Sequence, residues 1–180
     1  MVQWQKLIKT MKEPQESIKI AIVGKYVALP DSYMSVKESI IHASIPVKRT
    51  INIEWVNSED IISGNVRSLL GDVNGIIVPG GFGERGIEGM IVTANFAREN
   101  NIPYFGLCLG MQIMVIEFAR NVLGFEGANS TEFDPQSEFP VIDMMPSQMN
   151  VDKKGGTMRL GEYRCNLLKN TKAGNSYLMD

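Results

Sequence analysis

The chain has 180 residues and a mass of 20.0 kDa, the size of one ordinary domain. Its 18 basic and 20 acidic residues give a net charge of −2, so no positive surface for duplex nucleic acid or an anionic membrane is expected. No apolar run approaches the roughly 20 residues that span a bilayer. Two cysteines without a CxxC motif predict neither a disulfide framework nor a metal site. We therefore expect a cytoplasmic enzyme or binding domain without nucleic-acid or membrane partners.

The first dozen residues predict one short amphipathic helix. Trp4, Leu7, Ile8 and Met11 recur at i, i+3, i+4 and i+7, and Pro14 ends the pattern. A helix of this length is marginal in isolation, so its apolar stripe must pack on something. It fits a helix docked on this domain or the end of a linker from a preceding domain, and composition favours the docked helix.

From residue 17 onward, short apolar runs alternate with helical patterns. Strands are predicted at 18–23, 50–56, 76–78 and 103–107, and helices at 33–45, 59–70, 87–99 and 111–119. This alternation predicts an α/β fold with a mainly parallel sheet flanked by helices. Beyond Leu123, residues 124–138 are polar and turn-rich, residues 146–156 predict a mobile loop, and residues 157–168 predict a β-hairpin or two edge strands.

The segment 104–112, YFGLCLGMQ, carries the strongest chemical signal. Cys108 lies between a predicted strand and a predicted helix, with Gly106 and Gly110 two residues to either side, as in a nucleophile elbow with Cys in place of Ser. The N-terminus of a helix favours a thiolate, and the Leu109 amide would point toward an oxyanion. The alternative is a small buried cysteine in a tight connection. The flanking strand and helix favour the nucleophile.

A second glycine-rich turn, PGGFG at 79–83, ends the preceding strand of the sequence. Glycines allow the backbone to direct its amides inward at close range, as an oxyanion hole requires. A phosphate-binding turn is the alternative, but no Gly-Lys-Ser/Thr follows, so this is not a Walker A loop. Together with the elbow, the turn favours the oxyanion role.

The run PGGFGERG followed by NNIPYFGLCLGMQ resembles the class I glutamine amidotransferases, which hydrolyse glutamine and pass ammonia to a partner active site. IAIVGKYVALPDSYMSVKESI, GANSTEFDP and GGTMRLG resemble, within that family, the glutaminase domains of CTP synthases. The resemblance extends from about Trp4 to the end of the chain. It implies a flavodoxin-like three-layer fold, with residues 1–16 as a linker helix from an amidoligase domain and 17–180 as part of the amidotransferase domain, which reverses the preference from composition.

The resemblance also implies roles for individual residues. Cys108 would form the γ-glutamyl thioester, and the amides of Gly81 and Leu109 would form the oxyanion hole. Glu132 would hold the α-amino group of glutamine, a task that suits a carboxylate, although its spacing alone fits a solvated loop residue. The glutamine site would be lined by Gly81, Phe82, Leu109, Gly110, Met111, Gln112 and Glu132.

The chain departs from the family pattern in one respect. The family's catalytic His and Glu, and an Arg that binds the substrate carboxylate, belong to a segment beyond the residues present, and the single histidine, His42, does not match them. We therefore expect the isolated chain to be inactive. No cofactor is expected in this domain, because Mg, ATP and UTP would bind the amidoligase domain of a homo-oligomeric enzyme. GTP is an effector in the family, and although Arg85 and Arg159 lie in glycine-rich loops, neither is assigned to it.

Three hypotheses remain open at this stage. The first is the glutaminase part of a CTP synthase, which supplies ammonia for the ATP-dependent amination of UTP. The second is a non-catalytic regulatory or assembly module of the same fold, against which the intact GLCLGMQ argues. The third is a free-standing cysteine hydrolase, which would need a histidine of its own.

Overall fold

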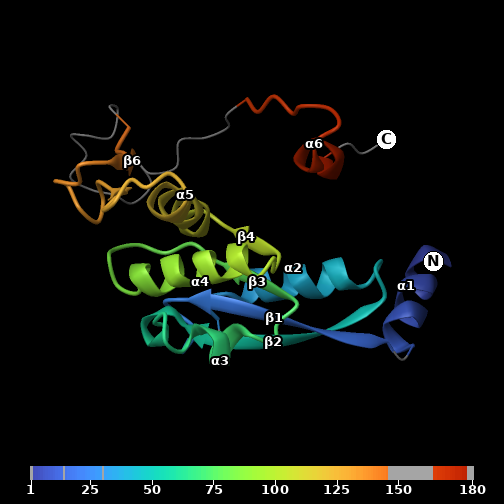
Figure 1. Cartoon of the computed structure of the whole chain (residues 1–180). Coiled ribbons are helices and arrows are strands. Elements are labelled where there is room, and N and C mark those ends of the chain that lie inside the picture. The colour runs from blue at the N-terminus through green and yellow to red at the C-terminus, as the bar shows by residue number, and fades with distance from the viewer. Residues whose placement is uncertain (1, 14, 30, 146–163, 178–180) are drawn as a thin grey trace. The chain divides into compact units, whose positions relative to one another are not determined.

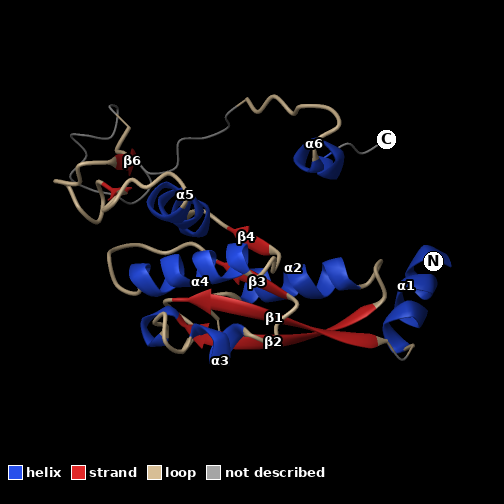
Figure 2. Ribbon diagram, viewed as in Figure 1, coloured by secondary structure: helices blue, strands red, loops and turns tan. Residues whose placement is uncertain are grey.

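The computed structural model describes residues 2–13, 15–29, 31–145 and 164–177, and it divides into two units, residues 1–143 and 144–180 (Figure 1). The first unit contains a four-stranded parallel sheet in the order β2-β1-β3-β4 (Figure 2). Its strands are β1 (Glu16–Gly24), β2 (Arg49–Asn57), β3 (Gly75–Val78) and β4 (Tyr104–Gly106). The predicted mainly parallel sheet is confirmed.

Helices connect these strands in chain order. The first unit contains α1 (Val2–Lys12), α2 (Met34–Ser44), the 3-10 turn η1 (Ser58–Asp60), α3 (Val66–Leu70), α4 (Ile87–Glu99) and α5 (Leu109–Asn121). After α5, the short strands β5 (Asn129–Ser130) and β6 (Pro140–Ile142) pair with each other. None of the described helices combines the length and apolarity that crossing a bilayer requires.

Alternation along the strands gives the sheet two apolar faces. Ala21 and Val23 of β1, with Ile76 and Val78 of β3, belong to a buried core with residues of α3, α4 and α5. The intervening positions, such as Ile20, point to the face on which α2 packs; this second set includes Ile18, Ile20, Ile51, Ile77 and Phe105 together with Ile40 and Ala43 of α2. Helices therefore cover both faces, and the predicted three-layer arrangement is confirmed.

The predicted helix at 59–70 is wrong as a single element. The chain forms η1 and then α3, with turn residues between them. Asn65 accounts for the break, because its side-chain oxygen accepts a hydrogen bond from the Ile62 amide at 2.9 Å and its nitrogen donates to the Asp60 carbonyl at 2.8 Å. These bonds compete with the helical pattern, as asparagine commonly does.

The predicted helix near the N-terminus is confirmed as α1, but its stripe is only partly covered. Trp4, Ile8 and Met11 are exposed, whereas Leu7 is half-buried and lines a cavity with Ile45 and Pro46. The stripe therefore retains apolar surface for a further partner. The assignment of residues 1–16 as an interdomain linker stays a prediction.

The second unit contains α6 (Lys172–Tyr177). The Thr171 hydroxyl caps the N-terminus of this helix, since it accepts from the Gly174 amide at 2.9 Å and donates to the Leu168 carbonyl at 2.8 Å. Residues 164–168 are not in a strand, so the predicted strands at 157–168 are wrong for that part. The rest of that segment and the predicted loop at 146–156 lie outside the described residues.

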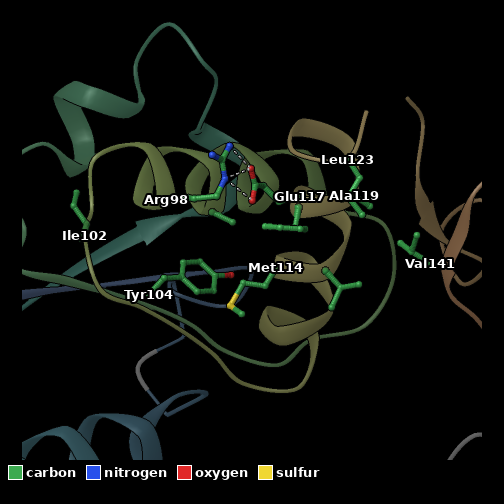
Figure 3. Close-up of a pocket in the computed structure, with 11 residues that line it drawn as sticks. Arg98, Ile102, Tyr104, Met114, Glu117, Ala119, Leu123 and Val141 are labelled. Carbon is green, nitrogen blue, oxygen red and sulfur yellow. Dashed lines mark hydrogen bonds and ion pairs between the residues drawn. The ribbon is translucent and has the colours of Figure 1, made fainter. Parts of the chain in front are cut away.

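Helix α5 is apolar on more than one side. Its buried side is formed by Ile113, Ile116 and Ala119, whereas Met114 and Phe118 are exposed by 44% and 46%. The exposed side borders a cavity of about 500 Å³ between α4, α5, β4 and β6 (Figure 3). The predicted helix is confirmed, but the sequence pattern did not show which apolar side faces the core.

An ion pair between α4 and α5 lies beside this cavity, where Figure 3 shows the two side chains facing each other. The Glu117 side chain is 3% exposed, and its Oε1 accepts from Arg98 Nε at 3.0 Å and Nη2 at 2.9 Å. The carboxylate raises the pKa of Arg98 through these hydrogen bonds. The pair joins the last turn of α4 to the second half of α5.

Removal of one partner of the Arg98–Glu117 ion pair should destabilise the folded chain. Arg98→Met should lower the free energy of unfolding by about 2–3 kcal/mol, because it leaves a buried carboxylate without its cation; the value falls below the ~3–5 kcal/mol of fully buried pairs since Arg98 is partly exposed. The double variant Arg98→Met/Glu117→Met should recover most of this loss. Urea unfolding measures both, and a single variant within about 0.5 kcal/mol of the wild type, the effect of an ordinary surface substitution, would contradict the prediction.

Candidate active site

The connection from β4 to α5 is the predicted elbow. Strand β4 ends at Gly106, α5 begins at Leu109, and Cys108 precedes the helix with φ 53° and ψ −106°. A positive φ is uncommon for a residue with a side chain and costs about 1–3 kcal/mol, so it indicates a strained turn. Cys108 is exposed, so the alternative of a buried structural cysteine is wrong.

Glycines allow the elbow to close. A Cβ on Gly110 would lie 2.0 Å from the Val78 carbonyl oxygen, and a Cβ on Gly106 would lie 2.3 Å from the Gly110 carbonyl carbon. The Tyr104 hydroxyl donates to the Gly110 carbonyl at 3.0 Å. Burial, and secondarily the Glu117 carboxylate, raises the pKa of Tyr104, so the phenol remains a donor at any ordinary pH. The turn is therefore fixed by close backbone packing and one phenol.

The second glycine-rich turn lies directly beside the elbow. It follows β3, which pairs with β4, and the Leu107 amide donates to the Val78 carbonyl at 2.9 Å. A Cβ on Gly80 would lie 3.3 Å from Cys108 Cβ and 3.7 Å from its Sγ. Gly80 thus brings bare backbone against the thiol, a role that the sequence did not single out.

Gly81 and Leu109, the predicted oxyanion residues, lie close together. A Cβ on Gly81 would be 3.5 Å from Leu109 Cδ2. The amides of the three residues after Leu109 donate to the carbonyls of Leu107 and Cys108. Within the described part of the chain, neither the Gly81 amide nor the Leu109 amide donates to another residue, which leaves both available to an oxyanion.

Glu132 comes from a distant part of the chain to the same turn. It follows β5, and its Oε1 accepts a hydrogen bond from the Gly83 amide at 3.3 Å. Its own amide donates to the Ser130 hydroxyl at 3.2 Å. The carboxylate is exposed and can bind a cationic group.

The remaining predicted glutamine-site residues differ in exposure. Phe82 and Met111 are exposed by 63% and 47%, Gln112 is half-buried, and Leu109 and Gly110 are buried. The buried pair can therefore contribute only backbone groups to a ligand. The structure groups Cys108 with the Gly80–Gly81 backbone and Leu109, and it groups Glu132 with Gly83.

Lys25, which the sequence did not single out, lies beneath the glycine-rich turn. It directly follows β1, it is 4% exposed, and its Nζ donates to the Phe82 carbonyl at 3.1 Å and to the Gly83 carbonyl. The ammonium also lies 5.9 Å from the centroid of the Phe133 ring. Burial lowers the pKa of Lys25, and the nearby Glu132 carboxylate opposes this effect. A lysine that follows an apolar strand and a glycine was the available sequence signal.

Arg85 and Tyr26 complete the surroundings of the turn. Arg85 Nη1 pairs with Glu59 Oε1 at 2.6 Å, and its Nη2 donates to the Lys25 carbonyl at 3.2 Å. Its guanidinium lies 5.9 Å from the centroid of the Tyr26 ring, whose hydroxyl accepts from the Phe82 amide at 3.5 Å. Arg159 lies outside the described residues.

Two further aromatic residues, Tyr33 and Trp55, link Tyr26 to strand β2. The Tyr33 hydroxyl accepts from the Tyr26 amide at 3.3 Å, and the Tyr33 ring stacks on Trp55 with centroids 6.5 Å apart. Burial raises the pKa of Tyr33. This stack connects β2 to the end of β1.

His42 does not belong to the site. It is exposed in the last turn of α2, just before β2 begins, and thus lies toward the amino-terminal edge of the sheet. Cys108 follows the carboxyl end of β4, at the opposite edge. Among the described residues, no group of three or more His, Cys, Asp or Glu side chains could hold a metal ion.

Comparison with known proteins identifies the family. Residues 28–178 match the family model described as glutamine amidotransferase class-I. The chain is 58% identical over 174 residues to a CTP synthase of Dehalococcoides mccartyi (strain BAV1), which covers 97% of this chain and 32% of that protein. It is 54% identical over 175 residues to the CTP synthase of Clostridium acetobutylicum, covering 97% and 33%.

A solved structure agrees with this result. The glutaminase domain of Trypanosoma brucei CTPS with bound acivicin superposes with a TM-score of 0.68 and 38% sequence identity, covering 79% of this chain and 61% of that one. The chain spans about a third of the length of the curated relatives that it matches. With the family model matching most of its length, and with the elbow and parallel sheet in place, the chain belongs to the class-I glutamine amidotransferase family.

Proposed function

We propose that this chain is the glutaminase part of a CTP synthase, which hydrolyses glutamine and supplies the ammonia that aminates UTP. The observation that carries the proposal is the exposed Cys108 with its positive φ, placed against the bare backbone of Gly80. A nucleophile needs access to its substrate and nearby amides for the developing charge, and this geometry supplies both. The similarity to CTP synthases over 97% of the chain supports the choice among amidotransferases.

The reaction begins at the thiol. Cys108 Sγ attacks the side-chain amide carbon of glutamine, and the carbonyl oxygen becomes an oxyanion that accepts hydrogen bonds from the Gly81 and Leu109 amides. The C–N bond then breaks as the C=O bond re-forms, the proton that the thiol gave up ends on the departing nitrogen, and ammonia leaves a γ-glutamyl thioester. Water hydrolyses the thioester to glutamate and restores the thiol. Each oxyanion donor is worth about 10²–10³ in rate.

Glu132 is proposed to hold the α-ammonium of glutamine. Its carboxylate is exposed, and its bond to the Gly83 amide fixes it beside the turn that carries Gly81. Phe82, Met111 and Gln112 would line the same site. With the α-ammonium of glutamine held at Glu132, the side-chain amide of the substrate, which lies several bonds away, would reach Cys108.

The partners of the reaction are also proposals. A general base and a proton donor would come from outside the described residues, because His42 lies at the other edge of the sheet. UTP and magnesium-bound ATP would bind an amidoligase domain joined through residues 1–16, in a homo-oligomeric cytoplasmic enzyme. GTP would act on that enzyme as an effector.

The test is a chimaera in which this chain replaces the matching 175 residues of the Clostridium acetobutylicum CTP synthase. We expect CTP formation from UTP and ATP with either glutamine or ammonia as the nitrogen source. Cys108→Ala should reduce the glutamine-dependent rate by more than 10³-fold, on the order of the loss that follows removal of a nucleophile, while the ammonia-dependent rate stays unchanged. A Cys165→Ala control should retain both rates.

Other outcomes would overturn the proposal. A chimaera that forms CTP from ammonia but never from glutamine would support the non-catalytic module instead. Retention of the glutamine-dependent rate in Cys108→Ala would show that the nucleophile is another group.

A further inference from the structure

Lys25 occupies a position that the reaction described above does not use. Its side chain is almost completely buried, yet among the described residues no buried carboxylate is bonded to its ammonium, which instead donates to the backbone carbonyls of Phe82 and Gly83. Burial of an ammonium is costly unless the group gains strong bonds. A buried cation at this position therefore indicates that the Phe82 and Gly83 carbonyls need to be held in a fixed orientation.

The peptide geometry shows what these bonds hold. In a trans peptide, the C=O of one residue and the N–H of the next point in opposite directions. When the Phe82 carbonyl faces Lys25, the Gly83 amide must face the other way, and this amide is the donor to Glu132 Oε1. Lys25 thus orients one peptide group whose opposite side holds the candidate ammonium-binding carboxylate.

The aliphatic part of Lys25 acts on the adjacent residue. A Cβ on Gly81 would lie 3.3 Å from Lys25 Cδ and 3.6 Å from Cε, so the methylenes pack under the candidate oxyanion residue. The main chain of Lys25 is fixed as well, because its carbonyl accepts from Arg85, which pairs with Glu59. One residue is therefore in contact with both halves of the turn.

We propose that Lys25 is a positioning residue that holds residues 80–83 so that the Gly81 amide faces the thiol and Glu132 faces the substrate ammonium. This inference rests on the proposed function. It predicts that loss of the Lys25 cation weakens the response of Cys108 to glutamine-shaped reagents, without a comparable change in the intrinsic reactivity of the thiol.

The test compares two reagents on the full 180-residue chain. One is the analogue of glutamine in which a chloromethyl ketone replaces the amide, and the other is iodoacetamide, which needs neither an oxyanion hole nor an amino-group site. In Lys25→Met, we expect labelling of Cys108 by the analogue to slow about 10- to 100-fold, the scale of one lost oxyanion donor or less. Alkylation by iodoacetamide should remain within about twofold, the scale of a site effect of a few tenths of a kcal/mol. The matched control is Lys19→Met, a half-buried lysine of β1 that pairs with Asp72.

Each outcome has a defined meaning. Equal labelling of folded Lys25→Met and wild type by the analogue would overturn the Lys25 assignment alone. Absence of analogue labelling in the wild type, with iodoacetamide still reacting, would overturn the proposed function and this inference together. If Lys25→Met does not fold, Lys25→Gln keeps an N–H donor and should show a smaller slowing; unfolding of both variants would show a purely structural role and contradict the inference.

Discussion

Alkylation by the chloromethyl-ketone analogue of glutamine should be confined to Cys108, with Cys165 reacting at least about 100-fold more slowly, the value of a single oxyanion donor. Both cysteines are exposed, so access alone does not distinguish them. Cys108 lies at the start of α5, near the Gly81 and Leu109 amides, which donate to no other residue that the structure describes, whereas Cys165 lies in a segment without helix or strand. Mass spectrometry of digested protein measures the two sites separately.

Iodoacetamide provides the control for this experiment. Iodoacetamide should modify both cysteines, because each thiol is accessible, and Cys108→Ala should eliminate only the labelling by the glutamine analogue. Preferential modification of Cys165 by the analogue in folded protein would contradict the assignment. The strand predicted around Cys165 is wrong, because the thiol lies in an exposed, irregular segment.

Gly110→Ala should be the most damaging single methyl addition at the elbow. The new Cβ would lie 2.0 Å from the Val78 oxygen and 2.9 Å from its carbon, and both atoms belong to the backbone of β3. Neither β3 nor α5 can move without disturbing the core, so we expect a loss of about 3 kcal/mol or more in the free energy of unfolding, at the upper end for overpacking. Labelling of Cys108 by the glutamine analogue should disappear as well.

Gly64→Ala provides the matched control. A Cβ at Gly64 meets nothing closer than Ile62 Cδ1 at 4.0 Å, and its φ is not positive. The same chemical change should therefore alter stability by no more than about 1 kcal/mol, in either direction. Chemical denaturation of both variants measures the difference, and equal stabilities would show that the elbow tolerates a side chain.

The fold was largely predictable because a parallel α/β sheet has a strong periodic signal. Short β-branched runs such as 18–23 became β1, and the helices at 87–99 and after Cys108 were confirmed. The failure at 59–70 arose from a single asparagine whose side chain competes with the helix, which periodicity does not detect. The inner side of α5 was also not predictable, since both of its sides are apolar.

The part of the candidate site that is built from residues close together in the sequence was predictable. Gly106, Cys108 and Gly110 adjoin one another in sequence, so the elbow followed from spacing. The close approach of Gly80 to the thiol and the position of Lys25 depend on which strands become neighbours, and therefore on the order β2-β1-β3-β4. Residues that act through the tertiary arrangement carry little signal of their own in a single sequence.

The stack of Trp55 on Tyr33 gives the chain a built-in optical probe. Trp55 is 39% exposed and is joined through Tyr33 and Tyr26 to the amide of Phe82, while the other tryptophan, Trp4, lies on α1. A Trp4→Phe variant would leave Trp55 as the sole indole emitter. Its fluorescence would then report rearrangement of the glycine-rich turn in real time, without a label and without any chemical step at Cys108.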